Sequence, residues 1–396
     1  MPFSLYLLGL AVFAQGTSEF MLSGLGPAIA ADLAVSLPAA GALTSAFALG
    51  MIVGAPLAAI LSLRWSRRRA LLLFLLCFLF AHVVGALTTG YWLLLAMRIL
   101  GALANAGFLA VALITATDLV APDAKGRATA TLLGGVTIAC IAGVPAGALL
   151  GQLWGWRSAF WAVAIISVPA VVGILHAVPT GAVETRRPSA RRELRALRRP
   201  RLAVTLLLAA LVNGATFCTF TYLAPVITEI AGLGAAWVPA MLALFGFGSF
   251  IGVASAGHIA DTRPIPLLGW GGLALCVGWV GFAVTAGHPV AATVLVLITA
   301  TLSFAVGSTL ISQMLYAATE APNLAGALAT AAFNVGAALG PWLGGLAIGA
   351  GFGYRSPLWI SAALVASALV VGGTAWATGR RDAVPPPDGE MSPSMR

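Results

Sequence analysis

Charge is what this sequence has least of. Of its 396 residues, 12 are acidic and 21 are basic, so charged residues make up 8% of the chain and hydrophobic residues 60%. A soluble domain needs far more polar residues to cover its surface, so the composition excludes one. Cysteine is scarce too. The four cysteines lie at scattered spacing within apolar stretches, which indicates packing and implies neither a disulfide nor a metal framework.

The chain also lacks the motifs of ATP-driven proteins and of common enzymes. Its one lysine, Lys125, is followed by Gly126, and no G-x-x-x-x-G-K-[ST] phosphate-binding loop occurs. H-E-x-x-H, C-x-x-C and G-x-S-x-G are absent, and the four histidines are scattered. We therefore expect no enzyme, no cofactor and no metal site.

Long apolar runs are what the sequence has in abundance. Twelve stretches are each long enough to cross a hydrocarbon core roughly 30 Å thick at about 1.5 Å per helical residue. They predict an all-α membrane protein with twelve transmembrane helices. The first stretch carries no signal-peptide pattern, so we expect it to remain as an uncleaved helix. The stretches lie near residues 3–29, 38–62, 70–88, 91–117, 128–152, 158–178, 202–228, 237–260, 265–286, 289–317, 325–350 and 356–378.

The basic residues separate by side of the membrane. If the N-terminus is cytoplasmic, 18 of the 21 basic residues fall on cytoplasmic connections and the tail, Arg157 and Arg355 fall on the opposite side, and Arg98 lies within a span. This positive-inside pattern predicts a multi-pass protein of the bacterial inner membrane with both termini cytoplasmic. It also disfavours nucleic acid, the partner that a net charge of +9 suggests for a soluble protein. The arginine-rich loop is a candidate for contact with anionic lipids.

The two halves of the chain resemble each other. "GWRSAFW" at 155–161 matches "GYRSPLW" at 353–359, an offset of 198 residues that also takes Pro27 onto Pro225. "APDAKGRA" at 121–128 meets "APNLAGAL" at 321–328 at an offset of 200. Parallel repeats of six helices are typical of secondary transporters, whose site lies between the halves. The predicted organisation is an N-terminal bundle 1–178, a cytoplasmic linker 179–200, a C-terminal bundle 201–378 and a cytoplasmic tail 379–396.

Three motifs resemble those of the major facilitator superfamily. "GHIADTRP" at 257–264 looks like its conserved loop between helices 8 and 9, and "RILGALANAG" at 98–107 like its helix 4 arginine motif. "GVPAGALLG" at 143–151 resembles the helix 5 motif of its proton-coupled drug exporters. With "TSEFMLSGLGPAIAADL" at 17–33, the chain most resembles the actinobacterial chloramphenicol-resistance exporters. The resemblance implies a drug/proton antiporter with a cavity near the middle of the membrane.

The sequence departs from the family pattern at two places. Leu63 stands where the family has an aspartate in the first-half loop, opposite Asp261 in the second half. Gly101 and Ala102 replace a glutamine and a glycine in the helix 4 motif. The resemblance implies a conformational latch on the cytoplasmic side formed by Arg64, Asp261 and Arg263. The alternative for Asp261 and Arg263 is a capping pair at a helix end.

Glu19 is the one charge between Leu5 and Pro27. A charged carboxylate facing lipid is unfavourable, so we expect Glu19 to face a water-filled cavity or to bind a proton. Arg98 is predicted at a similar depth, roughly 10 Å below the outer surface against 14 Å for Glu19. We hypothesise that Arg98 biases Glu19 towards ionisation and that substrate entry shifts this balance. The alternatives are a structural glutamate bonded to a neighbouring helix and an arginine that fixes helix packing through backbone carbonyls.

Uncharged polar residues suggest a substrate pocket with mainly apolar walls. Asn213, Thr216, Thr219 and Tyr222 recur every three residues and so lie roughly on one helix face. Other helices contribute further candidates, although packing between helices explains each one equally well. These further candidates are Asn105, Ser303, Ser308, Gln313 and Asn334.

Prolines and glycines suggest how the helices bend and pack. Pro145 and Pro341 are predicted to bend helices 5 and 11, with or without a part in the mechanism. Glycines four residues apart, as at Gly50 and Gly54 or Gly340 and Gly344, are expected to let helix backbones approach closely.

Together these patterns predict proton-coupled efflux of a small, partly apolar drug by alternating access, with Glu19 as the proton and substrate site. The proton gradient is the expected energy source, with one proton per substrate as the simplest ratio. The resemblance names chloramphenicol as the drug. The alternative is an exporter of sugars, nucleosides or other metabolites with a more polar pocket, while a channel or receptor has no need of Glu19. The expected partners are the drug, protons and the bilayer, with a monomer expected.

Overall fold

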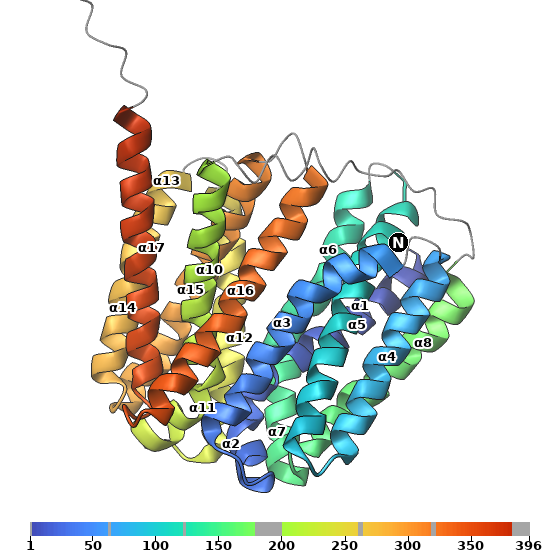
Figure 1. Ribbon diagram of the computed structural model, residues 1–396, viewed down its shortest axis with the longest axis horizontal. Coiled ribbons are helices and arrows are strands. Elements are labelled where there is room, and N and C mark those ends of the chain that lie inside the picture. The colour runs from blue at the N-terminus through green and yellow to red at the C-terminus, as the bar shows by residue number, and fades with distance from the viewer. Residues whose placement is uncertain are drawn as a thin grey trace, which may run out of the picture.

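The computed structural model describes residues 2–61, 65–121, 124–178, 200–259, 264–317 and 322–381. All regular structure in these ranges is helical, and the helices stand side by side (Figure 1). We call the end of the molecule where α1 begins and α17 ends the terminal face, and the end where α2 ends and α17 begins the distal face (Figure 1). Nearly all of the predicted linker 179–200 and most of the predicted tail 379–396 lie outside the described residues.

The described residues of the first half form eight α-helices and one π-helical turn, η3. They are α1 Phe3–Phe20, α2 Leu22–Asp32, α3 Leu37–Leu61, α4 Arg67–Leu87, α5 Tyr91–Asp118, α6 Lys125–Ile138, η3 Ala139–Gly143, α7 Val144–Trp154 and α8 Arg157–Ala177.

The second half contains long helices joined or interrupted by short helical turns. They are α10 Pro200–Thr221, α11 Leu223–Pro225, the π-turn η4 Val226–Ile230, the 3₁₀ turn η5 Ala235–Trp237, α12 Val238–Ile259, α13 Pro264–Pro266, the π-turn η6 Leu267–Gly271, α14 Gly272–Thr285, α15 Pro289–Ala317, α16 Pro322–Gly349 and α17 Ser356–Arg381.

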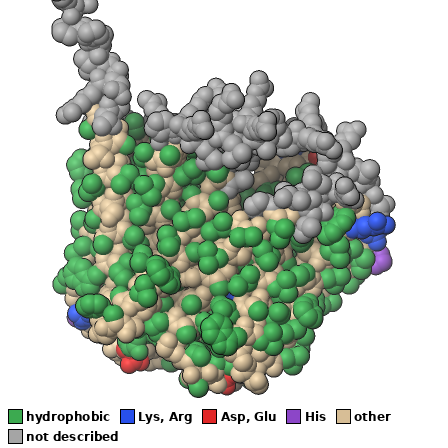
Figure 2. Space-filling view, in the orientation of Figure 1, with side chains coloured by type: hydrophobic (Ala, Val, Ile, Leu, Met, Phe, Trp, Pro, Cys, Tyr) green, Lys and Arg blue, Asp and Glu red, His purple; other side chains and the backbone are tan. Residues whose placement is uncertain are grey.

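The described residues contain up to twelve candidate membrane spans, in agreement with the twelve predicted from the sequence. Eleven helical segments within the described ranges are long and apolar enough to cross a membrane, and the bent pair α1 and α2 makes the twelfth. Helices are favoured here because every backbone N–H and C=O must find a partner within the segment when no water is available. Hydrophobic side chains cover the middle of the face seen in Figure 2, and most charged side chains in view lie towards its margins.

The buried hydrophobic residues form two large clusters, one in each half. The first extends from Leu5 to Val178 and the second from Ala209 to Ala368, with Val144 and Ala148 of α7 joining the second. Each half therefore packs mainly on itself. The exact boundaries predicted for the two bundles stay a prediction.

The repeated motif forms the same turn twice. Gly155 and Gly353, which are 198 residues apart, have φ angles of 79° and 73°, a region that favours glycine. In each turn the backbone N–H and the hydroxyl of the serine three residues later bond to the glycine carbonyl, at Ser158 in the first half and Ser356 in the second. The sequence repeat thus starts α8 and α17 in the same way.

The first span is broken near its middle. Helices α1 and α2 meet at Met21 with an angle of 53°. Pro27, inside α2, has no N–H to donate to the carbonyl of Ser23. The hydroxyl of Ser23 donates to the Phe20 carbonyl at 2.8 Å, across the break. In the second half α10 ends at Thr221, shortly before Pro225. Both halves therefore interrupt their first span ahead of the matched proline.

Glycines bring helix backbones together, as their spacing predicts. A Cβ added at Gly50 or Gly54 of α3 would lie within 3.0 Å of atoms of α5. A Cβ at Gly340 of α16 would collide with the carbonyl of Gly214 on α10. These contacts need residues without a side chain because backbone atoms of the neighbouring helix lie within 3.0 Å of each added Cβ.

Replacing Gly340 with alanine tests this packing. We expect Gly340→Ala to lower stability by about 1–3 kcal/mol, because the new methyl group has to push α10 and α16 apart. The measurement is the melting temperature of the detergent-solubilised protein. Gly281→Ala is the matched control, since a Cβ at Gly281 meets nothing within 4 Å and should leave the melting temperature unchanged. Equal melting of the two variants would contradict the close contact.

Candidate functional site

A cavity of about 450 Å³ lies between the two halves of the molecule. Its walls come from α1 and the α6–η3 region on one side and from α10, α12, α15 and α16 on the other. The volume lies in the range of roughly 300–1,000 Å³ that is typical of small-molecule sites. Aromatic rings form much of its lining: Phe20, Phe217, Phe250, Phe304 and Phe333.

Glu19 is the one charged side chain among the described residues that line this cavity. It is half-buried and lies two residues before the break at Met21. The cavity gives the carboxylate a place away from lipid, as its position in the sequence predicts. Cys140 of η3 lines the same cavity and was not anticipated from the sequence.

Arg98 is buried inside the N-terminal half and does not line the cavity. Its side chain is 2% exposed, and its guanidinium carbon is 4.3 Å from the centroid of the Phe47 ring. Its Nη1 donates to the carbonyl and to the hydroxyl of Ser18, both at 2.9 Å. Arg98 and Glu19 interact electrostatically, but no ion pair within 4.0 Å joins them. The arginine therefore contacts the residue next to Glu19 on α1.

Five of the nine predicted polar candidates line the cavity, namely Asn213, Thr216, Ser303, Ser308 and Asn334. Asn213 donates to the Phe333 carbonyl at 2.6 Å, Thr216 to the Val212 carbonyl at 3.0 Å and Asn334 to the Thr330 carbonyl at 3.0 Å. Hydroxyl groups from α12 and α15 add further polar atoms to the lining: Ser249, Ser303 and Ser308. Of these three, the Ser303 hydroxyl has no hydrogen-bond partner among the described residues.

The other four predicted candidates lie elsewhere. Asn105 is buried on α5, and Gln313 is half-buried on α15, but neither lines the cavity. The Tyr222 hydroxyl donates to the Pro341 carbonyl at 2.9 Å, which places this side chain between α10 and α16. Thr219, from the same predicted face, bonds to Ser361 of α17 at 2.7 Å. The three-residue spacing therefore does not keep all four side chains on one face.

The distal face is closed by contacts between the halves. Phe20 of α1 packs on Phe217 and Phe220 of α10, with ring centroids 5.6 and 6.5 Å apart. Nearer the distal face, the Tyr222 ring lies against Gly41 of α3, where an added Cβ would collide with the tyrosine hydroxyl. At the distal face itself the amide of Gln152 donates to the Ala235 carbonyl at 2.6 Å. The cavity therefore lies on the terminal side of this closure.

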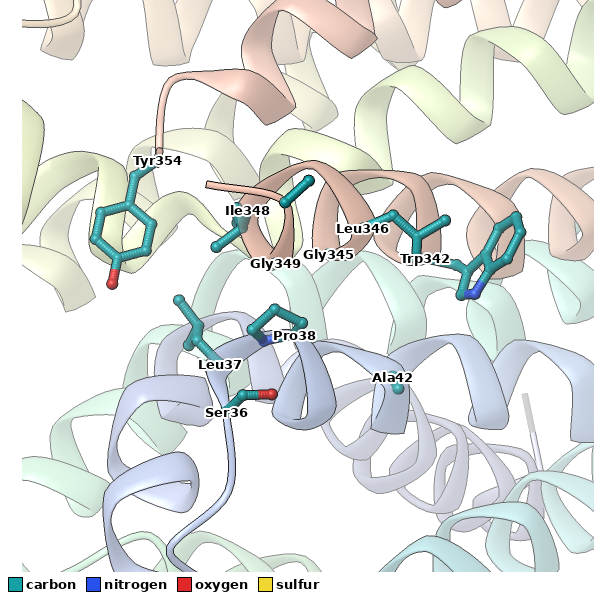
Figure 3. Close-up of a pocket in the computed structure, with 11 residues that line it drawn as sticks. Ser36, Leu37, Pro38, Ala42, Trp342, Gly345, Leu346, Ile348, Gly349 and Tyr354 are labelled. Atoms are coloured by element: carbon teal, nitrogen blue, oxygen red, sulfur yellow. The ribbon is translucent and has the colours of Figure 1, made fainter. Parts of the chain in front are cut away.

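A larger space, of about 690 Å³, lies at the distal end of α3 and α16 and is a poorer candidate for the site (Figure 3). Figure 3 shows Leu37 and Pro38 of α3 facing Gly345 and Gly349 of α16. None of the described residues that line it is charged, and it lies beside the contact that closes the distal face.

The predicted bends are local. Pro145 follows the π-turn η3, which widens the helix just before the proline, and the span from Lys125 to Trp154 is otherwise continuous. Pro341 lies inside the continuous helix α16. The largest break is at Met21, a position that the sequence analysis did not single out.

The predicted latch residues Arg64, Asp261 and Arg263 lie outside the described residues. At the terminal face, Arg67 at the start of α4 forms an ion pair with Asp118 at the end of α5. At the distal face, Arg157 pairs with Asp32 at 2.6 Å, and the Trp156 indole donates to the same carboxylate oxygen at 3.1 Å. No group of three metal-ligating side chains occurs in the part of the chain that the structure describes.

Known proteins share this architecture. Residues 8–329 match the family model described as Major Facilitator Superfamily. The chain is 55% identical over 374 residues to a chloramphenicol resistance protein of Streptomyces lividans, covering 94% of this chain and 95% of the relative. It is 36% identical over 352 residues to the inner membrane transport protein YdhP of Escherichia coli (strain K12), covering 89% and 90%. A solved bacterial homologue of the human lysosomal transporter Spinster, in an inward-facing and unoccupied conformation, matches with a TM-score of 0.74 at 18% identity, covering 99% of this chain and 98% of that one.

The contact between Gly41 and Tyr222 makes a prediction about the distal closure. We expect Gly41→Ala to separate the halves at this face, because the added methyl group occupies the place of the tyrosine hydroxyl. The measurement is the distance between spin labels at the exposed positions 154 and 237, which leave Gln152 in place, in a protein whose four native cysteines are replaced. That distance should increase by several ångströms. Gly90→Ala, at a distal-face glycine with nothing within 4 Å of an added Cβ, should leave it unchanged.

Proposed function

The chain belongs to the Major Facilitator Superfamily, and we propose that it exports a small, partly apolar drug in exchange for protons. It is a multi-pass membrane transporter and not an enzyme. The observation that carries the proposal is the lining of the central cavity, in which Glu19 is the sole charged side chain that the structure describes, among aromatic rings and a few hydroxyl and amide groups. Glu19 is proposed to bind the proton, and the remaining lining to bind the drug.

The proposed orientation places the terminal face in the cytoplasm. Among the described residues, Arg67, Arg68, Arg69, Lys125 and Arg127 lie at that face. Arg157 and Arg355 lie at the distal face. Basic residues favour the cytoplasmic side. In this orientation the cavity receives drug from the cytoplasm while the contacts of Phe20, Gly41 and Gln152 keep the outer side closed.

In the proposed exchange, the drug and the proton occupy the same cavity in turn. Drug enters from the cytoplasm when Glu19 has released its proton, and the rocking of the two halves then opens the distal face. There the drug leaves and Glu19 takes a proton, because a neutral carboxyl group is more easily carried through the closed, water-poor intermediate than a charged one. Arg98 favours ionised Glu19 through its charge and so supports proton release on the cytoplasmic side.

The membrane potential supplies enough energy for this exchange. A proton that moves inward down 100 mV releases about 2.3 kcal/mol. With one proton per drug molecule, this holds roughly a fifty-fold concentration gradient.

Chloramphenicol is the proposed drug. The support is the name of the relative that is 55% identical to this chain, together with the chemistry of the cavity. Chloramphenicol has a nitrophenyl ring, which suits the phenylalanine rings, and two hydroxyl groups and an amide, which suit Asn213, Thr216 and Ser303. Sugars and nucleosides need more hydrogen-bonding groups than the described lining offers, so the drug is favoured over these metabolites.

The role of Glu19 is tested in inside-out vesicles with an imposed pH gradient. We expect wild-type protein to accumulate labelled chloramphenicol and Glu19→Gln to fall to the level of vesicles without the protein, because glutamine cannot exchange a proton. Asp32→Asn is the matched control, since Asp32 also belongs to the bent first span but pairs with Arg157 at the distal face. Transport that survives in Glu19→Gln and is lost in Asp32→Asn would move the proton site to Asp32.

The contribution of Ser303 to drug binding is tested with the same vesicles. Because its hydroxyl has no partner among the described residues, it is free to bond to the drug, and we expect Ser303→Ala to raise KM about fivefold with little change in maximal rate. The hydroxyl of Ser249 lines the same cavity but already donates to the Gly246 carbonyl at 2.6 Å, so Ser249→Ala should change KM little. Equal KM values in the two variants would contradict this assignment.

A further inference from the structure

A buried histidine connects α4 to the region of Glu19. His82 is 3% exposed, and its ring lies 4.1 Å from the Phe78 ring and 5.7 Å from the Phe160 ring, centroid to centroid. Its Nδ1 is 2.7 Å from the carbonyl of Phe78 and its Nε2 is 2.6 Å from the hydroxyl of Ser18. The same hydroxyl accepts a hydrogen bond from Arg98. Three helices, α1, α4 and α5, therefore meet at the side chain of Ser18.

The direction of each hydrogen bond follows from the groups involved. The Phe78 carbonyl can only accept, so Nδ1 of His82 carries a hydrogen and donates it. Arg98 can only donate, so Ser18 Oγ accepts from it. The Ser18 hydroxyl then has its own hydrogen left to donate to Nε2 of His82, which accepts it if the imidazole is neutral. A second positive charge beside buried Arg98 is unfavourable, which favours this neutral form.

This chain of bonds fixes one side of the Arg98 guanidinium and leaves the other side unpaired. Nη1 is held by the carbonyl and the hydroxyl of Ser18, and the Phe47 ring lies under the guanidinium. Nε and Nη2 have no hydrogen-bond partner among the described residues. A buried guanidinium with free donors is attracted to a nearby carboxylate, yet Arg98 forms no direct ion pair with Glu19. Something therefore holds the guanidinium away from Glu19.

We propose that His82 and Ser18 are positioning residues that tether Arg98 and so prevent a direct ion pair with Glu19. The tether leaves the arginine near enough to act on the carboxylate through its charge, but too constrained to lock it in the ionised form. This inference rests on the proposed role of Glu19 in proton exchange and deepens it by assigning the residues that set its proton affinity. It explains why a buried histidine lies among apolar residues in the last part of α4.

Loss of the tether should change the pH at which Glu19 binds a proton, and the direction of this change can be stated. The titratable or charged groups that face Glu19 are Arg98 of α5 and Cys140 of η3, and Arg98 is the charged group that faces His82. Without the tether, Arg98 is the cation that moves onto Glu19. A direct ion pair favours the ionised carboxylate, so protonation of Glu19 then requires a lower pH.

The test is the release of protons when chloramphenicol is added to the purified, weakly buffered protein over a series of starting pH values. Wild-type protein should release protons with a defined pH midpoint, and Glu19→Gln should abolish the release. His82→Phe keeps an aromatic ring in place but removes both ring nitrogens, and it should move the midpoint by about one unit to lower pH. Ser18→Ala removes the shared hydroxyl by a smaller change and should move the midpoint in the same direction, so it also serves if His82→Phe does not fold.

Two further variants separate the tether from general packing. His82→Gln places an amide oxygen near the position of Nε2 and should return the midpoint towards the wild-type value. Ser167→Ala should not move it, because this buried hydroxyl of α8 bonds only within its own helix, to the Val163 carbonyl at 2.8 Å.

The outcomes distinguish the two proposals. Wild-type protein without Glu19-dependent proton release overturns the proposed function and the tether with it. Release that depends on Glu19, with an unmoved or raised midpoint in both His82→Phe and Ser18→Ala, overturns the tether alone. A midpoint lowered in both variants and restored by His82→Gln supports the tether.

Discussion

The constraint on which the whole structure depends is the absence of water from the hydrocarbon core. It forces the described backbone into helices, since each N–H and C=O must be satisfied within its own segment. Because of this constraint, a break in a helix or an ionisable side chain within a span indicates a special environment. The break at Met21 is buried in protein and lies two residues from Glu19, whose carboxylate lines the central cavity. Irregular backbone and ionisable groups are tolerated at this depth only where they are buried in protein or face such a cavity.

The two halves of the chain repeat the same structural features but contribute differently to the proposed mechanism. Gly155 and Gly353 make the same turn, and the paired prolines Pro27 and Pro225 each follow an interruption of the first span of their half. The halves have nevertheless specialised. The first provides the ionisable residues Glu19, Arg98 and His82, while the second provides most of the aromatic and hydroxyl lining of the cavity. The chemistry of coupling and the surface proposed for drug binding thus come from different halves, so a movement of one half against the other changes both together.

The sequence was sufficient for the spans, the helical class and the family, because hydropathy and the glycine and proline motifs are local properties. The cavity lining was only partly predictable. A helix turns about 100° per residue, so residues three apart fall behind by about 60° each time, and Tyr222 ends about half a turn away from Asn213. Asn105 is seven residues after Arg98 and so shares its buried face on α5. The break at Met21 was signalled by Gly24, Gly26 and Pro27 in one apolar segment, but the position of Ser18 between His82 and Arg98 depends on three helices that no local pattern relates.

Each face of the molecule carries a partly exposed ion pair within the first half, whereas the contact that closes the distal face between the halves is of another kind. Around Tyr222 the closure consists of a ring that fits against glycine backbones, with one hydrogen bond to the Pro341 carbonyl. The terminal face carries the arginines of α4, and Arg67 pairs there with Asp118 where both side chains are partly exposed. Dissolved salt screens exposed charges but has little effect on the fit of a buried ring. Ionic strength therefore acts on the ion pairs at both ends far more than on the closure around Tyr222, so the distal contact between the halves should persist over a wide range of salt concentrations.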